Sequence, residues 1–364
     1  MLNAGFAPNL KIKQLSKPGN FERYLYTGSI VLLSMVVSVL ICEWKGSTWE
    51  RKVRFTFYDI FLDSFPDYAP NICDPNGVPR TFYPEQNGIT PGWQYNGTIV
   101  ANYAIDYYRN MQHNGDTLLQ RKFMNCLHWL DSAVSEVKGH ALYLFHWRQP
   151  WYPLVDSPFT SGMTSGLAIE AFTYGFLHTG DSAWLQKAAR LVRGFDLEVK
   201  DGGFTYIEPN GWWYEEIADS GLQTPRILDG HIFSLTGLQA YYAVSKDTLA
   251  KRYFRYGLDA LKAALPSYDR GDGYVYYDAA KKIADENYHP LLVNQMKQMF
   301  EITGETVFNE YYEKWNTPLA KPYMYKVWRD GNKTGWLLYG MVTGGVFILF
   351  LLLVIWLRRL QPRK

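Results

Sequence analysis

Two long apolar runs lie near the ends of the chain and frame a central region of mixed polarity. The first extends from Tyr24 to Cys42 and contains no charged residue. The second extends from Trp336 to Leu357 and is followed by Arg358 and Arg359. Each run is long enough for a helix to cross the hydrocarbon core of a bilayer once. The pattern therefore predicts transmembrane helices over residues 24–42 and 336–357.

Basic residues in the flanking tails predict the orientation of these two spans. A chain that crosses twice keeps both termini on one side of the membrane. The tails over residues 1–23 and 358–364 are rich in Lys and Arg, which favours the cytoplasm. Lys45 and Arg51 follow the first span and weaken this asymmetry. The central domain would then be extracytoplasmic, in a periplasm, in a lumen or outside the cell.

Small residues on one face of the second span would let another helix approach closely. They are Gly335, Gly340, Gly344 and Gly345. The second span therefore permits a homodimer or a contact within a membrane complex.

Between the spans, helical patterns recur at a spacing of about 65 residues. The junctions contain residues that end one helix and begin the next: Gly, where present, can adopt the left-handed conformation that ends a helix, and a following Asp can cap the next N-terminus. The junctions are Asn114-Gly115-Asp116-Thr117, His178-Thr179-Gly180-Asp181-Ser182, Ser245-Lys246-Asp247-Thr248 and Thr303-Gly304-Glu305-Thr306. Helix pairs of this length predict an α/α toroid, or incomplete α-barrel, over residues 93–320.

The remaining segments of the central region lack helical periodicity. Two longer irregular stretches, 137–160 and 199–226, would gather at one rim of the toroid and line a cleft. Within such stretches, residues 203–207 and 273–277 read as short β-hairpins. Residues 43–92 contain several Pro and Gly residues, so we expect an extended linker between the first span and the toroid.

Composition excludes several classes of protein. The net charge of +2 gives no argument for nucleic-acid binding. Three cysteines exclude a disulfide-rich scaffold, although Cys73 and Cys126 could pair in an oxidising compartment. The sequence shows no metal-ligand spacing such as His-x-x-x-His, and we expect neither a metal nor a cofactor. Aromatic residues make up 17% of the chain, and their rings either pack in the core or stack on sugars.

Two short segments carry the candidate chemistry. Trp212-Trp213-Tyr214-Glu215-Glu216 and Asn287-Tyr288-His289-Pro290 hold carboxylates, phenols and an imidazole among aromatic rings. Such groups can bind a sugar and move a proton on and off carbon. Glu215 and Glu216 are adjacent, so their side chains should diverge, which disfavours them as the paired carboxylates of a glycoside hydrolase.

From about residue 85 to 319 the chain resembles the D-glucuronyl C5-epimerases, which convert glucuronate to iduronate within heparan-type polysaccharides. The similarity is strongest to the C-terminal domain of that family. The matching motifs occur in the family's order and spacing, and they are Phe159-Thr160-Ser161-Gly162-Met163, Trp213-Tyr214-Glu215-Glu216, Leu228-Asp229-Gly230, Leu265-Pro266-Ser267-Tyr268-Asp269, and Tyr288-His289 with Asn294-Gln295.

This resemblance implies roles for individual residues. Glu216 and Tyr288 stand where the family has its proton-transfer residues. A further family Tyr falls on Tyr276 or Tyr277, depending on a shift of one residue. The chain departs from the family in having Ile217 in place of a Tyr, Ala279 and Ala280 where an Arg is expected, and Ser165 and Leu167 in place of two Gln residues.

Other residues are expected to bind the substrate or to support its chemistry. A nearby cation would lower the free energy of forming a tyrosine phenolate, and Arg226 and His289 are the candidates. Tyr214, His231, Trp93 and Tyr95 are candidate substrate contacts. Asp229 stands in place of the family's Asn and reads as a helix cap rather than an acid.

The leading interpretation is a membrane-anchored epimerase that inverts C5 of uronate residues in a polysaccharide or a lipid-linked glycan. A polysaccharide lyase or uronyl hydrolase is one alternative, because a lyase begins with the same removal of the C5 proton. A glycan-binding subunit without activity is the other alternative.

Overall fold

The computed structural model describes residues 20–57, 71–221, 224–285, 287–329 and 331–360. The chain divides into two compact units, one of which contains the central residues up to Ala320, while the other contains the segments near the two ends. Most of each predicted basic tail, namely residues 1–19 and 361–364, lies outside the described residues.

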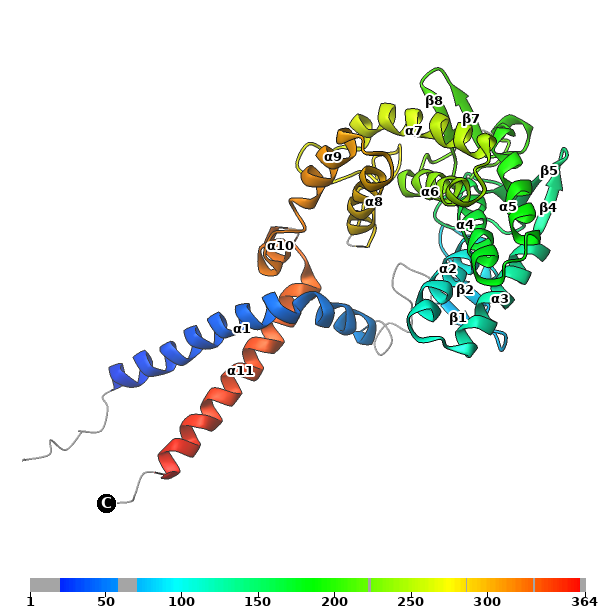
Figure 1. Cartoon of the computed structure of the whole chain (residues 1–364). Coiled ribbons are helices and arrows are strands. Elements are labelled where there is room, and N and C mark those ends of the chain that lie inside the picture. Colours follow the sequence, from blue (N-terminus) through cyan, green and yellow to red (C-terminus); the bar gives the residue numbers. More distant parts are fainter. Residues whose placement is uncertain (1–19, 58–70, 222–223, 286, 330, 361–364) are drawn as a thin grey trace, which may run out of the picture. The chain divides into compact units, whose positions relative to one another are not determined.

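Helix hairpins follow one another along the central unit, as the junction residues predicted (Figure 1). Each pairs a first helix with the next one along the chain. The pairs are α2 (Gly97–Asn114) with α3 (Thr117–Ser132), α4 (Gly162–Thr179) with α5 (Ala183–Arg193), α6 (Leu228–Ser245) with α7 (Thr248–Tyr268), and α8 (Tyr288–Thr303) with α9 (Thr306–Asn316).

The junctions have part of the predicted capping geometry, since the N-cap residues of α5 and α9 make no side-chain cap hydrogen bond. Gly115, Gly180 and Gly304 adopt left-handed backbone conformations just after α2, α4 and α8. Asp116 caps α3 and Asp247 caps α7, each by accepting backbone N–H groups of the first helical turn. These bonds satisfy N–H groups that have no partner within the helix.

The first helices of the hairpins form the inner layer of an incomplete α/α toroid. Helix α4 packs between α2 and α6, and α6 also contacts α8. Helices α4 and α6 are apolar around most of their circumference, which is typical of helices buried on all sides. They cross so closely that a methyl group at Gly237 would overlap the backbone of Gly166. The predicted fold class is therefore confirmed.

Short antiparallel sheets join the helices. Strands β1 (Asn71–Cys73), β2 (Pro79–Tyr83) and β3 (Gly92–Gln94) form the first sheet, before α2. Strands β4 (Val134–Val137), β5 (His140–Phe145) and β6 (Phe159–Thr160) form the second. Strands β7 (Thr205–Glu208) and β8 (Gly211–Tyr214) form the first of the two predicted hairpins.

Two expectations about the central unit need correction. The second predicted hairpin, over residues 273–277, contains only isolated pairs such as Tyr276 with Ile283, because Tyr276 donates to the Tyr268 carbonyl while Val275 accepts from Ala284, so the segment pairs with two others. The suggested pairing of Cys73 with Cys126 is absent, and both cysteines are free. The Cys126 thiol points to the carbonyl of Gly77 instead.

The second unit contains α1 (Asn20–Phe57), α10 (Tyr323–Arg329) and α11 (Lys333–Leu360). The expectation of an extended linker from residue 43 is wrong over its first part, because α1 continues to Phe57. The reason is a packing contact with α10. Glu43 accepts the backbone N–H groups of Tyr323 and Met324 at 2.6 and 2.9 Å, and the Tyr323 hydroxyl donates to Glu50 at 2.8 Å.

Helices α1 and α11 contain the predicted spans and contact each other within this unit. The segments Tyr24–Glu50 and Lys333–Leu357 are long and apolar enough to cross a membrane, with mean hydropathies of 2.3 and 2.5. Only 17% and 6% of their most apolar windows are buried, so the described residues leave most of this apolar surface uncovered. Gly335 packs against Val327 of α10, whereas Gly340, Gly344 and Gly345 face open space in the described structure.

Candidate active site

The first candidate motif follows strand β8, where Glu215 is fully buried. Its Oε2 atom accepts the backbone N–H of Arg226 at 3.1 Å, and its Oε1 atom lies 3.7 Å from the Arg226 guanidinium. The same guanidinium donates to both carboxylate oxygens of Glu208, at 3.1 and 2.5 Å. Burial raises the pKa of Glu215 to about 7, while Thr224 and Arg226 oppose that rise. Glu215 is therefore a structural anchor for the chain that leads to α6.

Glu216, the next residue along the chain, is half-buried and has different neighbours. It packs against the first turn of α6, where a methyl group at Gly230 would overlap the Glu216 side chain. The Glu216 Oε2 atom is buried and has no hydrogen-bond partner among the described residues. Burial raises the pKa of Glu216 well above its usual range, and the charges of Asp229 and Glu215 raise it further. Glu216 is thus a carboxyl with a raised pKa and no cationic neighbour in the described part of the chain.

Asp229 brings a second carboxyl to this position. It is 2% exposed, and its Oδ1 atom has no hydrogen-bond partner in the described part of the chain. Burial raises the pKa of Asp229 to about 7, although the backbone N–H groups of Asp229 and Gly230 lower it. The residue lies in the first turn of α6, but the N-cap is Ile227. Two neighbouring carboxyls in a desolvated site do not readily ionise together, so the pair retains a proton near neutral pH.

Two phenols from the chain between α7 and α8 belong to the same cluster. The rings of Tyr277 and Tyr288 are 4.5 Å apart. Tyr277 is buried, whereas Tyr288, at the start of α8, is 39% exposed. Burial raises the pKa of both phenols, and the charges of Asp229 and Glu216 raise it further. The two residues singled out for proton transfer, Glu216 and Tyr288, are therefore electrostatic neighbours.

The choice between Tyr276 and Tyr277 follows from their contacts. The Tyr277 ring contacts the Tyr288 ring at a tilt of 52°. The Tyr276 ring instead lies 5.1 Å from the Lys281 ammonium, and its backbone N–H donates to the Tyr268 carbonyl at 2.7 Å. The structure places Tyr277 in the cluster and leaves Tyr276 outside it.

Two further tyrosines complete the cluster, and sequence analysis missed both. The Tyr152 hydroxyl donates to Asp278 at 3.1 Å, and burial raises its pKa together with the charges of Asp278, Glu216 and Asp229. Burial raises the pKa of Tyr83 to about 12, and Glu216 adds to that rise. Tyr152 belongs to an irregular stretch that was expected to line a cleft. Tyr83 gave no signal because it lies in the region taken for a linker.

Tyr214 and His231 lie in the core, which corrects their expected contact with substrate. Both are fully buried. The His231 Nδ1 atom accepts the backbone N–H of Tyr214 at 3.0 Å, and its Nε2 atom lies 3.0 Å from the Gly257 carbonyl oxygen. The Tyr214 hydroxyl donates to the Tyr253 carbonyl at 2.7 Å. Burial lowers the pKa of His231 to about 4, so its ring is neutral at physiological pH.

Neither predicted cation supports the phenols. Arg226 is engaged with Glu208 and Glu215, as described above. The His289 Nε2 atom lies 3.0 Å from the Trp315 carbonyl oxygen, and burial lowers the pKa of this imidazole. Arg226 therefore holds Glu208 and Glu215, and His289 links the start of α8 to α9 through its Nε2 atom, while its buried Nδ1 atom has no hydrogen-bond partner among the described residues.

Trp93 and Tyr95 surround Arg80 on the first sheet. The Arg80 guanidinium carbon is 5.8 Å from the Trp93 ring centre and 5.4 Å from the Tyr95 ring centre. Tyr95 also stacks on Trp129 of α3, and its hydroxyl donates to Asp74 at 3.1 Å. Both rings are partly exposed and neither lines the pocket beside this sheet, so their expected role as sugar platforms stays a prediction.

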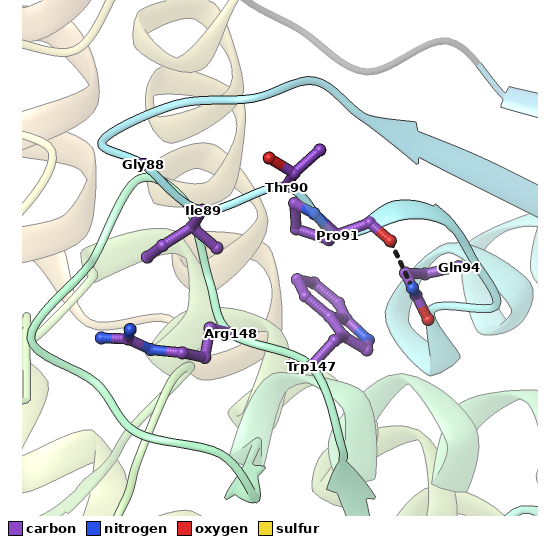
Figure 2. A pocket seen from close by; sticks show the side chains of 7 residues that line it. All are labelled: Gly88, Ile89, Thr90, Pro91, Gln94, Trp147 and Arg148. Carbon is purple, nitrogen blue, oxygen red and sulfur yellow. Dashed lines mark hydrogen bonds between the residues drawn. The ribbon is translucent and has the colours of Figure 1, made fainter.

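A pocket of about 390 Å³ opens beside the first sheet (Figure 2). It lies next to the cluster, because Trp147 in its wall packs on Tyr83 with ring centres 4.5 Å apart. The lining residues are Gly88, Ile89, Thr90, Pro91, Gln94, Trp147 and Arg148.

The cluster has the groups that proton transfer to and from carbon requires. A carboxylate with a raised pKa is a stronger base than an ordinary carboxylate, and a phenol with a raised pKa stays protonated as a donor. Among the described residues, no group of three or more His, Cys, Asp and Glu side chains could hold a metal ion.

Comparison with known proteins connects this site to one family. The family of the D-glucuronyl C5-epimerase C-terminus matches residues 139–317. A D-glucuronyl C5-epimerase of Caenorhabditis elegans is 27% identical over 175 residues, which cover 43% of this chain and 28% of that protein. An uncharacterized protein of Methanocaldococcus jannaschii is 25% identical over 192 residues, which cover 51% of this chain and 61% of that protein. The similarity thus spans only part of each relative.

Solved structures with a similar course of the chain are more distant. A cellobiose 2-epimerase from Bacillus thermoamylovorans is 11% identical, with a TM-score of 0.44 over 61% of this chain and 59% of that one. An unsaturated glucuronyl hydrolase specific for heparin is 14% identical, with a TM-score of 0.40 over 79% of this chain and 66% of that one.

Proposed function

We propose that this chain, whose residues 139–317 belong to the D-glucuronyl C5-epimerase C-terminal family, inverts C5 of hexuronate residues in a glycan while anchored to a membrane. The sugar-epimerase character rests on the family match. The uronate substrate, the stereochemistry and the membrane anchor are the further steps of the proposal.

One observation carries the proposal. The Glu216 and Asp229 carboxyls are electrostatic neighbours of the Tyr277 and Tyr288 phenols, and no described cation neutralises Glu216. A structural carboxylate is normally paired, as Glu215 is with Arg226. An unpaired buried carboxyl next to neutral phenols is typical of a site that moves protons.

The proposed reaction uses Glu216 as base and Tyr288 as acid. The Glu216 carboxylate removes the C5 proton, and the electron pair of the C–H bond moves into the sugar carboxylate. The Tyr288 hydroxyl then delivers its proton to the other face of C5. A carboxylate and a phenol become a carboxylic acid and a phenolate, so the net charge of the protein groups stays constant. This balance lessens the need for a cation beside the phenol.

The charge that develops on the sugar carboxylate needs hydrogen-bond donors. The Arg expected from the family is absent, because Ala279 and Ala280 stand there. The Tyr277 hydroxyl, buried beside Tyr288, is the donor that we assign to this task. Asp229 retains a role on the other side, where it raises the pKa of Glu216 and so strengthens the base.

The membrane part of the proposal rests on α1 and α11. Their apolar segments are exposed over most of their surface, which in water would be unfavourable by about 25 cal/mol for each Å² of apolar surface. Insertion of both helices would hold the central unit close to a bilayer, on the extracytoplasmic side. Such a position would suit a polysaccharide or a lipid-linked glycan as substrate.

The test is hydrogen exchange at C5. The full-length chain in detergent is incubated in heavy water with a glucuronate-containing polysaccharide, and NMR follows deuterium at C5 and the appearance of iduronate. We expect both with the natural chain and neither with Glu216→Gln. Tyr276→Phe is the matched control, since Tyr276 lies outside the cluster.

Other outcomes identify the alternatives. An unsaturated product would show a lyase, and chain cleavage without unsaturation would show a hydrolase. Glycan binding with no deuterium at C5 would show a binding subunit. Full activity of Glu216→Gln would remove Glu216 from the proposed reaction.

A further inference from the structure

The pocket lined by Trp147 and Arg148 is separate from the proton-transfer cluster but adjoins it. Tyr83 forms the boundary: its ring packs on Trp147 on one side, and it is an electrostatic neighbour of Glu216 on the other. The volume of about 390 Å³ falls within the range of small-ligand pockets.

The Trp147 ring is held in a fixed orientation. Tyr83 packs on it at 4.5 Å, while Phe145 and Phe159 meet it edge to face at 5.9 and 5.4 Å. The residue is only half-buried, and it lines the pocket. A rigid indole that borders a cavity is a suitable surface for the apolar face of a sugar ring, because little conformational entropy is lost on binding.

Polar groups lie at both ends of this pocket. Figure 2 shows Gln94 and Arg148 at opposite ends, with Trp147 and Pro91 between them. The Gln94 amide donates to the Pro91 carbonyl at 2.6 Å, which fixes the side chain and leaves its oxygen as an acceptor for a hydroxyl. Amide and guanidinium groups at the two ends would orient a ligand along the pocket.

Arg148 retains capacity for an anion. Its guanidinium donates to the Pro153 carbonyl at 2.8 Å, and the Asp156 carboxylate lies 3.9 Å away. Asp156 is 84% exposed, so water screens this long ion pair. A guanidinium has five N–H donors in a planar arrangement that matches a carboxylate or a sulfate.

The walls of the pocket are tied together without a ligand. Gln86 and Ile89 exchange two backbone hydrogen bonds of 3.0 Å, which closes the turn above the pocket. The Asn87 amide in that turn donates to the Pro150 carbonyl at 2.9 Å and links it to the segment that carries Trp147 and Arg148. The pocket is therefore preformed.

We infer that this pocket is a second sugar subsite for the glycan that reacts at Glu216. It holds another sugar residue of that glycan: Trp147 stacks on the sugar ring, and Arg148 binds its anionic group. This inference rests on the proposed function, because it names the part of the substrate that lies beside the reacting uronate. The anionic group is a carboxylate or a sulfate, and binding of unsulfated and sulfated probes distinguishes the two.

Binding is measured by calorimetry with the full-length Glu216→Gln chain, which holds substrate without turning it over. The probes are an unsulfated glucuronate-containing tetrasaccharide, its sulfated counterpart, and the same tetrasaccharide with its carboxyls reduced to alcohols. Arg148→Gln should weaken binding of the charged probes about tenfold, since a hydrogen bond to a charged group is worth roughly that factor. It should leave the reduced probe unaffected. A larger effect on the sulfated probe would assign the anion as sulfate.

Arg190→Gln is the matched control, because Arg190 is 46% exposed against 50% for Arg148 and pairs with Glu136 on another surface. Trp147→Ala should weaken all three probes, with the melting temperature as a check on folding. The subsite would be overturned if the chains with and without the Arg148→Gln change bound the charged tetrasaccharides equally well. It would also be overturned if neither chain bound any tetrasaccharide. Deuterium exchange at C5 is measured separately. Binding that depends on Arg148 without any exchange would contradict the proposed epimerase activity and support the subsite.

Discussion

Glu215 and Glu216 are neighbours in sequence and both are desolvated, yet their surroundings differ. Glu215 accepts a backbone N–H and faces the Arg226 guanidinium. Glu216 has Asp229 and two phenols as electrostatic neighbours and no cation among the described residues, although each of the two carboxyls has one buried oxygen without a hydrogen-bond partner. One carboxyl therefore stabilises the fold, while the other is poised to exchange a proton. Burial alone does not distinguish an anchor from a reactive group; the partners do.

The largest expected effect comes from removing the reactive carboxyl. Glu216→Gln should lower the C5 exchange rate on the order of 10³-fold, the usual contribution of a general base. The melting temperature should not fall, because a neutral amide relieves the repulsion with Asp229. Glu215→Gln is the contrast: it should lower the melting temperature and keep exchange in the folded fraction. The reverse pattern would show that the two roles are exchanged.

Breaking the anchor should act on stability. Arg226→Met leaves Glu215 buried without its cation and should lower the free energy of unfolding by about 3 kcal/mol. Chemical unfolding of the full-length chain, followed by tryptophan fluorescence, measures this loss. An unchanged unfolding curve would mean that Glu215 is not held by Arg226.

The phenols allow a second comparison of neighbours. Tyr288→Phe removes the proposed acid and should reduce exchange on the order of 10²-fold, whereas Tyr276→Phe should leave it unchanged. The difference arises because Tyr288 belongs to the cluster and Tyr276 packs beneath Lys281. Equal rates for the two variants would remove Tyr288 from the reaction.

The smallest effect concerns pH. The Asp229 charge raises the pKa of Glu216, so Asp229→Asn should move the acidic limb of the exchange–pH profile to lower pH by about one unit. A profile identical to that of the natural chain would show that the two carboxyls do not interact.

The same pair makes stability depend on pH. Burial raises the pKa of Asp229 from 3.8 to about 7, so the folded state binds this proton more tightly than the unfolded state. The contribution of Asp229 to the free energy of unfolding is therefore greatest below pH 4, and it declines as the pH rises towards 7. Glu215 and Glu216 act in the same direction, because their pKa values are also raised. The melting temperature should fall between pH 5 and pH 8, and less steeply in Asp229→Asn.

Local signals in the sequence predicted much of this architecture. Gly115, Gly180 and Gly304 mark the ends of helices because only a left-handed residue closes such a turn easily, and Asp116 and Asp247 cap the helices that follow them. The apolar runs predicted α1 and α11 by length alone. The linker was wrong because the continuation of α1 depends on Tyr323, which lies far away along the chain.

The sequence by itself determined the hairpin repeat, the two apolar helices, and the motifs that contain Glu216 and Tyr288, since each depends on residues close together along the chain. Only the tertiary structure decided which side chains are left without partners. It buried His231 between two backbone groups, engaged Arg226 with two carboxylates, selected Tyr277 over Tyr276, and set Asp229 beside Glu216. These outcomes depend on how β8, α6 and the segment before α8 pack together, and packing between distant segments leaves no local pattern in the sequence.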